Sequence, residues 1–196
     1  MDVSEAMEQV LADRVFYRHR GGLTVSGGEP TAQPEGLLAL LDEAKAENIH
    51  TCLETCGFFP ESLIAPLAQR VDLFLYDVKD TDDARHRENT GVPLAPILRN
   101  LRLLDDLGAE TVMRCVLIPE VNLNPEHAAA LAEIFAGLKH CRFVELLPYH
   151  PYGLSKSEQL GRTDVCYQQP DQQQIEGFAA LLKEKNVPVK FYGSMA

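Results

Sequence analysis

The sequence predicts an α/β protein whose parallel sheet is covered by helices. Six short runs rich in apolar and β-branched residues alternate with amphipathic stretches of helical spacing, and polar residues gather where those runs end. The 196 residues are 45% hydrophobic, which is enough for one sizeable core, so we expect a single domain over residues 1–196. Such strands fit either a partial (β/α) barrel or an open doubly wound sheet, and periodicity alone does not separate the two.

The expected elements follow one another along the chain. The first is a helix over residues 4–18, with Ser4 as its N-cap. The six strands are expected at 22–26, 50–55, 71–78, 111–118, 142–147 and 187–192. Helical patterns lie between most of them, at 34–48, 60–70, 94–108, 125–139 and 171–186. Pro34 and Gly108 stand where helices commonly begin and end.

The net charge of −11 argues against nucleic-acid and membrane partners, because an acidic surface repels phosphate groups. No apolar run is long enough to span a bilayer. The opening stretch "MDVSEAMEQV" lacks the basic start and apolar core of a signal peptide. We therefore expect a cytoplasmic protein.

The five cysteines are odd in number and scattered, so they indicate no disulfide framework. Cys52 and Cys56 are close in sequence, yet four residues of extended strand span about 13 Å. No group of histidines, cysteines and carboxylates has the spacing of a zinc site. The sequence therefore predicts no metal ligands in this chain, and we expect small, inert cysteines of the core type.

Unusual polar residues follow four of the expected strands, at the carboxyl ends where ligands bind in both candidate architectures. These residues are Ser26, Gly27, Gly28, Glu29, Glu54, Thr55, Asp77, Lys79, Pro148, Tyr149 and His150. Two glycines without a β-carbon let a ligand approach the backbone closely. An amino-acid-like ligand suits exposed backbone carbonyls together with Glu29, and a tight strand-to-helix turn is the alternative explanation of "GGE".

Alternation along the strands gives directions for three charged residues. In "LFLYDVK", Asp77 and Lys79 share a face with Leu73 and Leu75, so both point away from the helices and into the cleft. An internal ion pair between them is the alternative. Arg114 lies inside an otherwise apolar strand, where an unpaired guanidinium is costly. It therefore needs either a ligand or a carboxylate partner in the core.

The order of the motifs resembles a known family. "GGLTVSGGEPTAQP", "NIHTCLETCGF", "VDLFLYDVKD", "RCVLIP" and "VELLPYHPYG" are similar to segments of the glycyl-radical-enzyme activating enzymes, radical S-adenosyl-L-methionine (SAM) proteins related to pyruvate formate-lyase activating enzyme. The likeness covers nearly the whole chain, and it implies a partial TIM-like barrel of the radical SAM type. The stretch "YHPYGLSKSEQLG" looks more like the branch that carries an additional ferredoxin-type cluster domain.

The resemblance assigns one set of residues to the amino end of SAM. Gly27, Gly28 and Glu29 match the segment that holds the amino group, largely through its backbone. Glu54 with Thr55 matches a position near the same end.

The resemblance assigns a second set of residues to the rest of the cofactor. Its members are Asp77, Val78, Lys79, Arg114 and His150. The segment 77–79 matches residues that contact the ribose and the carboxylate, and His150 matches a histidine at the nucleoside end. Arg114 lies close to the cofactor in this alignment, with Val116 as a neighbour of the adenine.

One departure from the family is informative. The family holds a [4Fe–4S] cluster with three cysteines spaced C-x3-C-x2-C, and SAM binds the fourth iron. The present sequence has no such triplet, and "CLETC" supplies an x3 spacing without a third cysteine. The resemblance therefore implies the C-terminal portion of an activase, without the cluster loop and the first barrel strand. No catalytic residue is assigned within this chain, which we expect to be inactive alone.

The parent function implied by the resemblance is that of an oxidoreductase. The reduced cluster passes an electron to SAM, and the resulting 5′-deoxyadenosyl radical takes a hydrogen atom from a glycine of a partner glycyl radical enzyme. The implied partners are that enzyme and an electron donor such as flavodoxin or ferredoxin. The alternatives are a cluster-free module binding SAM or a nucleotide, a subunit of a split activase, and an inert scaffold. The missing first strand leaves the strand at 22–25 exposed, so we expect the chain to cover it. The helix at 4–18 can fold back over this edge, or a second copy can pair with it, and we favour self-association.

Overall fold

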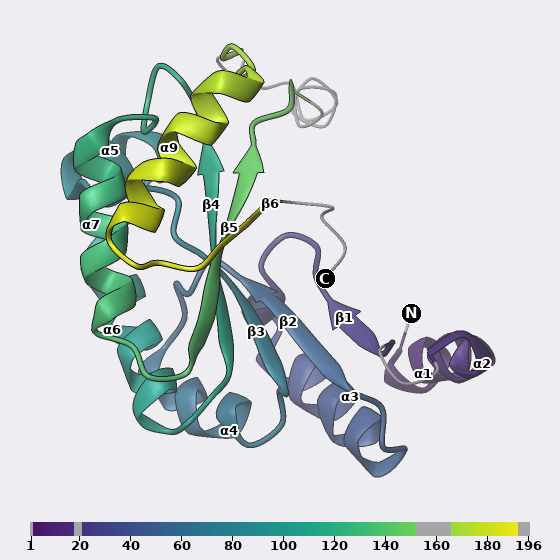
Figure 1. The fold of residues 1–196 in the computed structure, drawn as a ribbon. Helices are drawn as coiled ribbons and strands as arrows, with labels where there is room; N and C mark the ends of the chain where they lie inside the picture. Colours follow the sequence, from purple (N-terminus) through teal and green to yellow (C-terminus); the bar gives the residue numbers. More distant parts are fainter. Residues whose placement is uncertain (1, 18–20, 152–165, 192–196) are drawn as a thin grey trace. The chain divides into compact units, whose positions relative to one another are not determined.

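The computed structural model describes residues 2–17, 21–151 and 166–191 (Figure 1). The strands are β1 (Leu23–Val25), β2 (Thr51–Thr55), β3 (Leu73–Asp77), β4 (Thr111–Leu117), β5 (Cys141–Pro148) and β6 (Val189–Phe191). The α-helices are α1 (Val3–Ala12), α2 (Arg14–Tyr17), α3 (Pro34–Ala46), α4 (Ile64–Ala68), α5 (Asp83–Thr90), α6 (Leu94–Asp106), α7 (Pro125–Ala136) and α9 (Gln172–Glu184). Two short 3-10 helices are η1 (Pro30–Ala32) and η2 (Glu61–Leu63). Most of the stretch "YHPYGLSKSEQLG", from residue 152 onward, lies outside the described residues.

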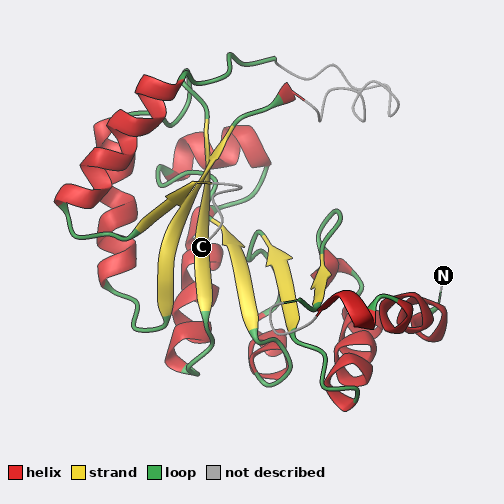
Figure 2. Cartoon of the chain, turned by 45° about the vertical axis from the view of Figure 1, so that its right-hand side comes forward, coloured by secondary structure: helices red, strands yellow, loops and turns green. Residues whose placement is uncertain are grey.

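The strands form one sheet in the order β1-β2-β3-β4-β5-β6 (Figure 2). The pairs β1/β2, β2/β3 and β5/β6 are parallel, with Leu23 opposite Thr51 and Val144 opposite Val189. All six expected strands are present, and helices separate them as an α/β fold requires. None of the described helices has the length and apolar character needed to cross a membrane.

The chain divides into two compact units. The first comprises Met1–Asp77, Ala95–Val112 and Leu138–Arg142. Its core includes the fully buried side chains of Leu41, Leu53, Leu67 and Phe74. The second comprises Val78–Leu94, Met113–Gly137 and Phe143–Ala196. Its core includes Met113, Leu117, Leu131 and Leu146.

Strand alternation in the first unit agrees with the sequence interpretation. In β3, Phe74 and Tyr76 are buried, and the Tyr76 hydroxyl donates to the backbone carbonyl of Ile97 in α6 at 2.7 Å. Leu75 and Asp77, on the other face, are partly exposed. Asp77 therefore points away from the layer of helix α6, as its position in the sequence predicts.

Two local expectations need correction. The first helix is capped by Asp2, not Ser4: the Asp2 side chain accepts from the Glu5 N–H at 2.9 Å and the Glu5 carboxylate accepts from the Asp2 N–H at 3.0 Å. This reciprocal pair satisfies two free backbone donors, which Ser4 within the helix cannot do. The helix expected to run to residue 18 is interrupted at Asp13, so α1 and α2 are separate.

Candidate functional site

The turn after β1 offers open backbone. Gly27 has φ of +133°, a conformation that side-chain-bearing residues rarely adopt. A β-carbon placed on Gly27 or Gly28 would meet no atom within 4 Å, so space remains beside both peptide units. The turn can therefore present backbone groups to a ligand that approaches closely.

Glu29 fixes this turn to the end of β2. One carboxylate oxygen accepts from the hydroxyls of Thr31 at 2.7 Å and Thr55 at 2.9 Å. The other accepts from the Cys56 N–H at 2.9 Å. Burial raises the pKa of Glu29, but the hydrogen bonds from Thr31, Cys56 and Thr55 outweigh burial and leave that pKa below its usual range. Glu29 is therefore ionised and engaged with its own chain, and the backbone of the turn is left for a ligand.

Glu54 and Thr55 lie on opposite faces of β2. Thr55 is buried, and besides its bond to Glu29 its hydroxyl accepts from the Gly57 N–H at 3.0 Å. Glu54 is partly exposed and accepts from the Ser26 hydroxyl at 2.5 Å. Ser26 and Glu54 thus tie β1 to β2 on the face that also carries Asp77. The first unit brings together the whole set that the resemblance assigns to the amino end of SAM.

Tyr76 lies next to this set. It is fully buried, and a β-carbon at Gly57 would collide with its hydroxyl. Gly57 has φ of +75°, so both space and backbone conformation require glycine there. Burial, together with the charges of Cys56 and Glu29, raises the pKa of Tyr76 well above its ordinary value. The phenol therefore stays neutral beside the ionised Glu29.

The second unit contains Val78, Lys79, Arg114 and His150. The Val78 N–H donates to the Arg114 carbonyl at 2.9 Å, which places the residue after β3 beside the middle of β4. Val78 is fully buried, while Lys79 is exposed and Arg114 is partly exposed. His150 is exposed and follows Tyr149, whose N–H donates to the Leu117 carbonyl at 3.1 Å. His150 thus follows the carboxyl end of β5 where that strand leaves β4.

Sequence reasoning missed a buried polar cluster in this unit. Asp80 accepts from both Arg85 Nε and Nη2 at 2.7 Å, and the Thr81 hydroxyl lies 2.8 Å from His127 Nδ1. His127 Nε2 lies 3.1 Å from Cys115 Sγ. Burial lowers the pKa of His127 to about 4, although the nearby Asp80 carboxylate opposes that shift. "KDTDD" directly after a strand is the signal that could have revealed this cluster.

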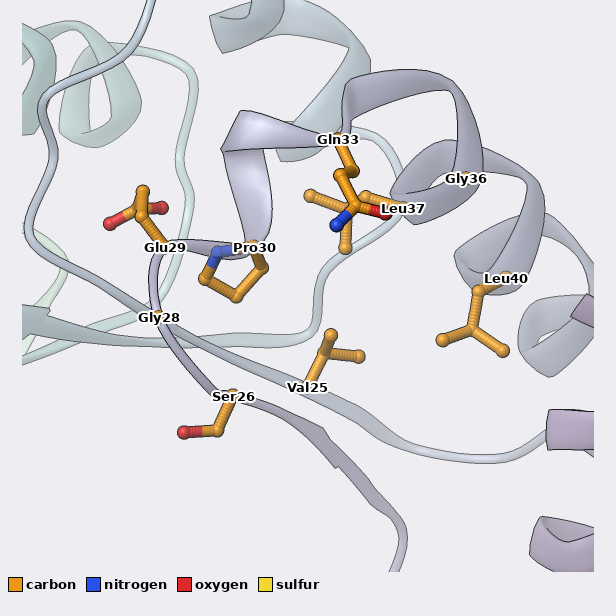
Figure 3. Close-up of a pocket in the computed structure, with 9 residues that line it drawn as sticks. All are labelled: Val25, Ser26, Gly28, Glu29, Pro30, Gln33, Gly36, Leu37 and Leu40. Atoms are coloured by element: carbon orange, nitrogen blue, oxygen red, sulfur yellow. The ribbon is translucent and has the colours of Figure 1, made fainter. Parts of the chain in front are cut away.

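A pocket with a volume of about 250 Å³ adjoins the turn after β1. Figure 3 shows Val25 directed toward Leu37, with Leu40 beyond it, while the Ser26 hydroxyl and the Glu29 carboxylate point away from these three side chains. The pocket is lined both by these apolar side chains and by the polar residues Ser26, Glu29 and Gln33, so it continues the candidate site along α3.

The described residues contain no group of three or more histidines, cysteines and carboxylates that could hold a metal ion. Among the cysteines, Cys115 alone is buried, Cys166 is exposed, and the other three are partly exposed. The expectation of core-type cysteines is therefore correct for Cys115 only. The described side chains therefore do not fit an iron–sulfur cluster.

Comparisons with known proteins agree with the fold and the motifs. The family model of the Radical SAM superfamily matches residues 1–132. A choline trimethylamine-lyase activating enzyme from Oleidesulfovibrio alaskensis is 40% identical over 163 residues, covering 81% of this chain and 53% of the relative. A (2S)-3-sulfopropanediol sulfolyase activating enzyme from Bilophila wadsworthia is 35% identical over 193 residues, covering 97% of this chain and 62% of the relative.

A solved structure of similar extent is also known. The crystal structure of a domain of pyruvate-formate lyase-activating enzyme from Bacteroides vulgatus has a TM-score of 0.75 and 25% identity, over 88% of this chain and 99% of that chain. This chain spans about half the length of several curated relatives that it matches. The similarities confirm the resemblance to activating enzymes of glycyl radical enzymes and the partial TIM-like barrel.

Proposed function

The chain belongs to the radical SAM superfamily, and from that premise we propose that it is the SAM-binding part of an activase for a glycyl radical enzyme. The observation that carries the proposal is the turn at Gly27 and Gly28, whose backbone is open and whose position Glu29 fixes. Such a turn can accept hydrogen bonds from an ammonium group through its carbonyls without moving when the ligand binds.

The residues divide the cofactor between them in this proposal. Gly27, Gly28 and Glu29 hold the amino end, supported by Glu54 and Thr55. Ser26 is added to this set because its hydroxyl orients Glu54. The partly exposed face of β2 and β3 carries Glu54 and Asp77, so both lie on the face proposed for the ligand.

A second set serves the ribose, carboxylate and nucleoside in this proposal, namely Asp77, Val78, Lys79, Arg114 and His150. Lys79 is exposed, so its ammonium group can reach the carboxylate of a bound ligand. The Val78 N–H donates to the Arg114 carbonyl, which fixes the segment after β3 against β4. These side chains bind and orient, and the cofactor supplies the chemistry.

When a reduced cluster is present, SAM supplies the radical that takes a hydrogen atom from the partner's glycine. The residues described here supply neither the electron nor the iron ligands, so the chain's own contribution is to bind SAM and to receive the glycine segment. The partner is proposed to be a glycyl radical enzyme, with a flavodoxin or ferredoxin as electron donor for the whole activase. The curated relatives that are named activating enzymes support this partner class.

Calorimetric titration of SAM into the purified chain tests the proposal. Weak saturable binding is expected, because the described residues hold no cluster that would help to bind the methionyl end of SAM. 5′-Methylthioadenosine, which lacks the amino-acid end, should bind more weakly still. An inert scaffold would bind neither compound, and equal affinity for both would favour the alternative of a general nucleotide-binding module.

Reconstitution with iron and sulfide under anaerobic conditions is a second test. The chain should retain no stoichiometric [4Fe–4S] cluster, since three or four thiolates normally hold one and no C-x3-C-x2-C triplet is present. Near one cluster per chain, with a spectrum that responds to SAM, would contradict the assignment. Cluster binding restored by adding a separate cysteine-bearing chain would favour the split activase.

A further inference from the structure

Asn122 bridges the carboxyl ends of two strands in the second unit. Its side-chain amide donates to the Lys79 carbonyl at 3.0 Å and to the Val116 carbonyl at 2.8 Å. Its side-chain oxygen accepts from the Ile118 N–H at 2.9 Å. Asn122 is 1% exposed, so all three bonds are formed away from water. A buried side chain with this pattern is costly to lose, because three backbone groups depend on it.

Asn122 adds hydrogen bonds beyond a backbone bond that joins the segment after β3 to β4. In that backbone bond the Val78 N–H donates to the Arg114 carbonyl. Further along, the carbonyls of Lys79 and Val116 both accept from the Asn122 side-chain amide. The side chain reaches this point because the loop after β4 folds tightly. The Ile118 carbonyl accepts from the N–H groups of Val121 and Asn122 at 3.0 Å.

The chain immediately after Lys79 is also fixed. The Asp80 carboxylate accepts from the N–H groups of Thr81 at 2.7 Å and Asp82 at 3.0 Å, besides its bonds to Arg85. The Thr81 hydroxyl is bonded to the buried His127. The backbone on both sides of the Lys79 carbonyl is therefore held by buried groups, while the Lys79 side chain is left exposed.

We infer that Asn122 is a positioning residue for the nucleoside end of SAM. This inference rests on the proposed function, which places Val78 and Lys79 at the ribose and the carboxylate and Arg114 close to the cofactor. The resemblance adds Val116 as a neighbour of the adenine. Asn122 touches no cofactor in this assignment. It acts by holding the Lys79 and Val116 backbones at a fixed separation, so that groups on both strands meet the ligand without a search for the right geometry.

Carbon-13 carbonyl signals of Lys79 and Val116 report the bridge directly. Asn122→Asp keeps an oxygen for the Ile118 N–H but removes both donors, so the two carbonyl signals should move upfield while the Ile118 amide signal changes little. The wild-type protein supplies an independent measurement, a scalar coupling from Asn122 Nδ2 to the carbonyl carbons of Lys79 and Val116. That coupling decides the question even where the variant does not fold.

Ligand titrations then test the positioning role. Asn122→Asp should weaken both SAM and 5′-methylthioadenosine by about ten-fold. Glu29→Gln, at the other end of the cofactor, should weaken SAM and leave 5′-methylthioadenosine nearly unchanged. Asp105→Asn is the matched control, because Asp105 is 3% exposed and bridges the N–H groups of Lys139 and His140 at the amino end of β5. It should lower the melting temperature without changing either affinity.

The outcomes separate the inference from the proposed function. Unmoved carbonyl signals, or no coupling in the wild type, would show that Asn122 does not hold these strand ends. Moved signals with unchanged affinity for both ligands, or with loss of SAM affinity alone, would overturn the positioning role. Failure of the wild-type chain to bind either ligand would instead overturn the proposed function, and the carbonyl measurements alone would then decide what Asn122 fixes.

Discussion

At the scale of single residues, Glu29 shows how one carboxylate can fix a glycine turn to a neighbouring strand. Its oxygens accept from Thr31, Thr55 and the Cys56 backbone, so they lock the glycine turn onto β2. In Glu29→Gln the side-chain NH2 group replaces one carboxylate oxygen, so it faces a group that donates to Glu29 in the wild type. We expect a loss of about 1–3 kcal/mol in the free energy of unfolding, measured by urea denaturation at pH 7.

The stability difference between the wild type and Glu29→Gln should depend on pH. The pKa of Glu29 is lowered in the folded chain, so its contribution is fully present above its unfolded value of about 4.5 and disappears as the pH falls through the folded value. The wild-type advantage over Glu29→Gln should therefore narrow below about pH 4.5. An advantage that stays constant down to pH 3 would mean that the charge of Glu29 is not what holds the turn.

Lys79 and Cys56 provide a contrast within the proposed site. Lys79→Ala removes an exposed ammonium group and should weaken SAM by about ten-fold, as loss of one charge-assisted bond implies. Cys56→Ala removes the thiol contact to Glu29 but keeps the backbone N–H that donates to it, so its SAM affinity should stay close to that of the wild type. Titration calorimetry compares the two variants, and equal losses would place the carboxylate of SAM elsewhere.

At the scale of elements, His127 joins α7 to the segment after β3. The imidazole is buried between Cys115 and Thr81, with Asp80 and Arg85 nearby, and burial lowers its pKa to about 4. In the unfolded chain the group is protonated below about pH 6.5, so the unfolded state binds more protons between pH 6.5 and 4. The protein should lose stability as the pH falls across this window, by up to about 3 kcal/mol.

Urea unfolding of wild type and His127→Gln across that window checks the assignment. Asp80 has a lowered pKa, because the hydrogen bonds from Arg85 and the Asp82 backbone outweigh its burial, and it contributes its own loss only in more acidic solution. The variant is less stable at pH 7 because the Thr81 and Cys115 contacts change, but its slope between pH 6.5 and 4 should be shallower. Parallel curves for the two proteins would show that His127 does not titrate there.

Most elements could be predicted from the sequence because their apolar periods are regular. Helix α5 could not, since "DARHRENT" has almost no apolar stripe, and its ends are set by Asp82, whose carboxylate accepts from the Arg85 N–H, and by Gly91 with φ of +77°. Among the site residues, the sequence predicted the open turn at the two glycines and the direction of Asp77 in β3. The role of Asn122 was not, because its three bonds join segments far apart in the chain.

At the scale of the whole molecule, the fold class follows from alternating elements, while the family follows from the order of five motifs. The sheet begins at β1, which pairs with β2 and has no second neighbour among the described strands. An unpaired edge is a template for pairing with another chain. We propose that a second copy covers the edge at 22–25.

Two proline variants of β1 test this proposal. The Leu23 N–H donates to the His50 carbonyl, so alternation along the strand directs the Thr24 N–H toward the open edge. Thr24→Pro therefore removes a donor from the edge without breaking the bond to His50, and proline is tolerated at such positions. It should abolish self-association in sedimentation velocity while changing the unfolding midpoint little.

Leu23→Pro is the matched control, because it breaks the His50 bond and should destabilise the chain. A wild-type chain that stays monomeric at high concentration, or a Thr24→Pro variant that associates as the wild type does, would show that this edge is not the interface.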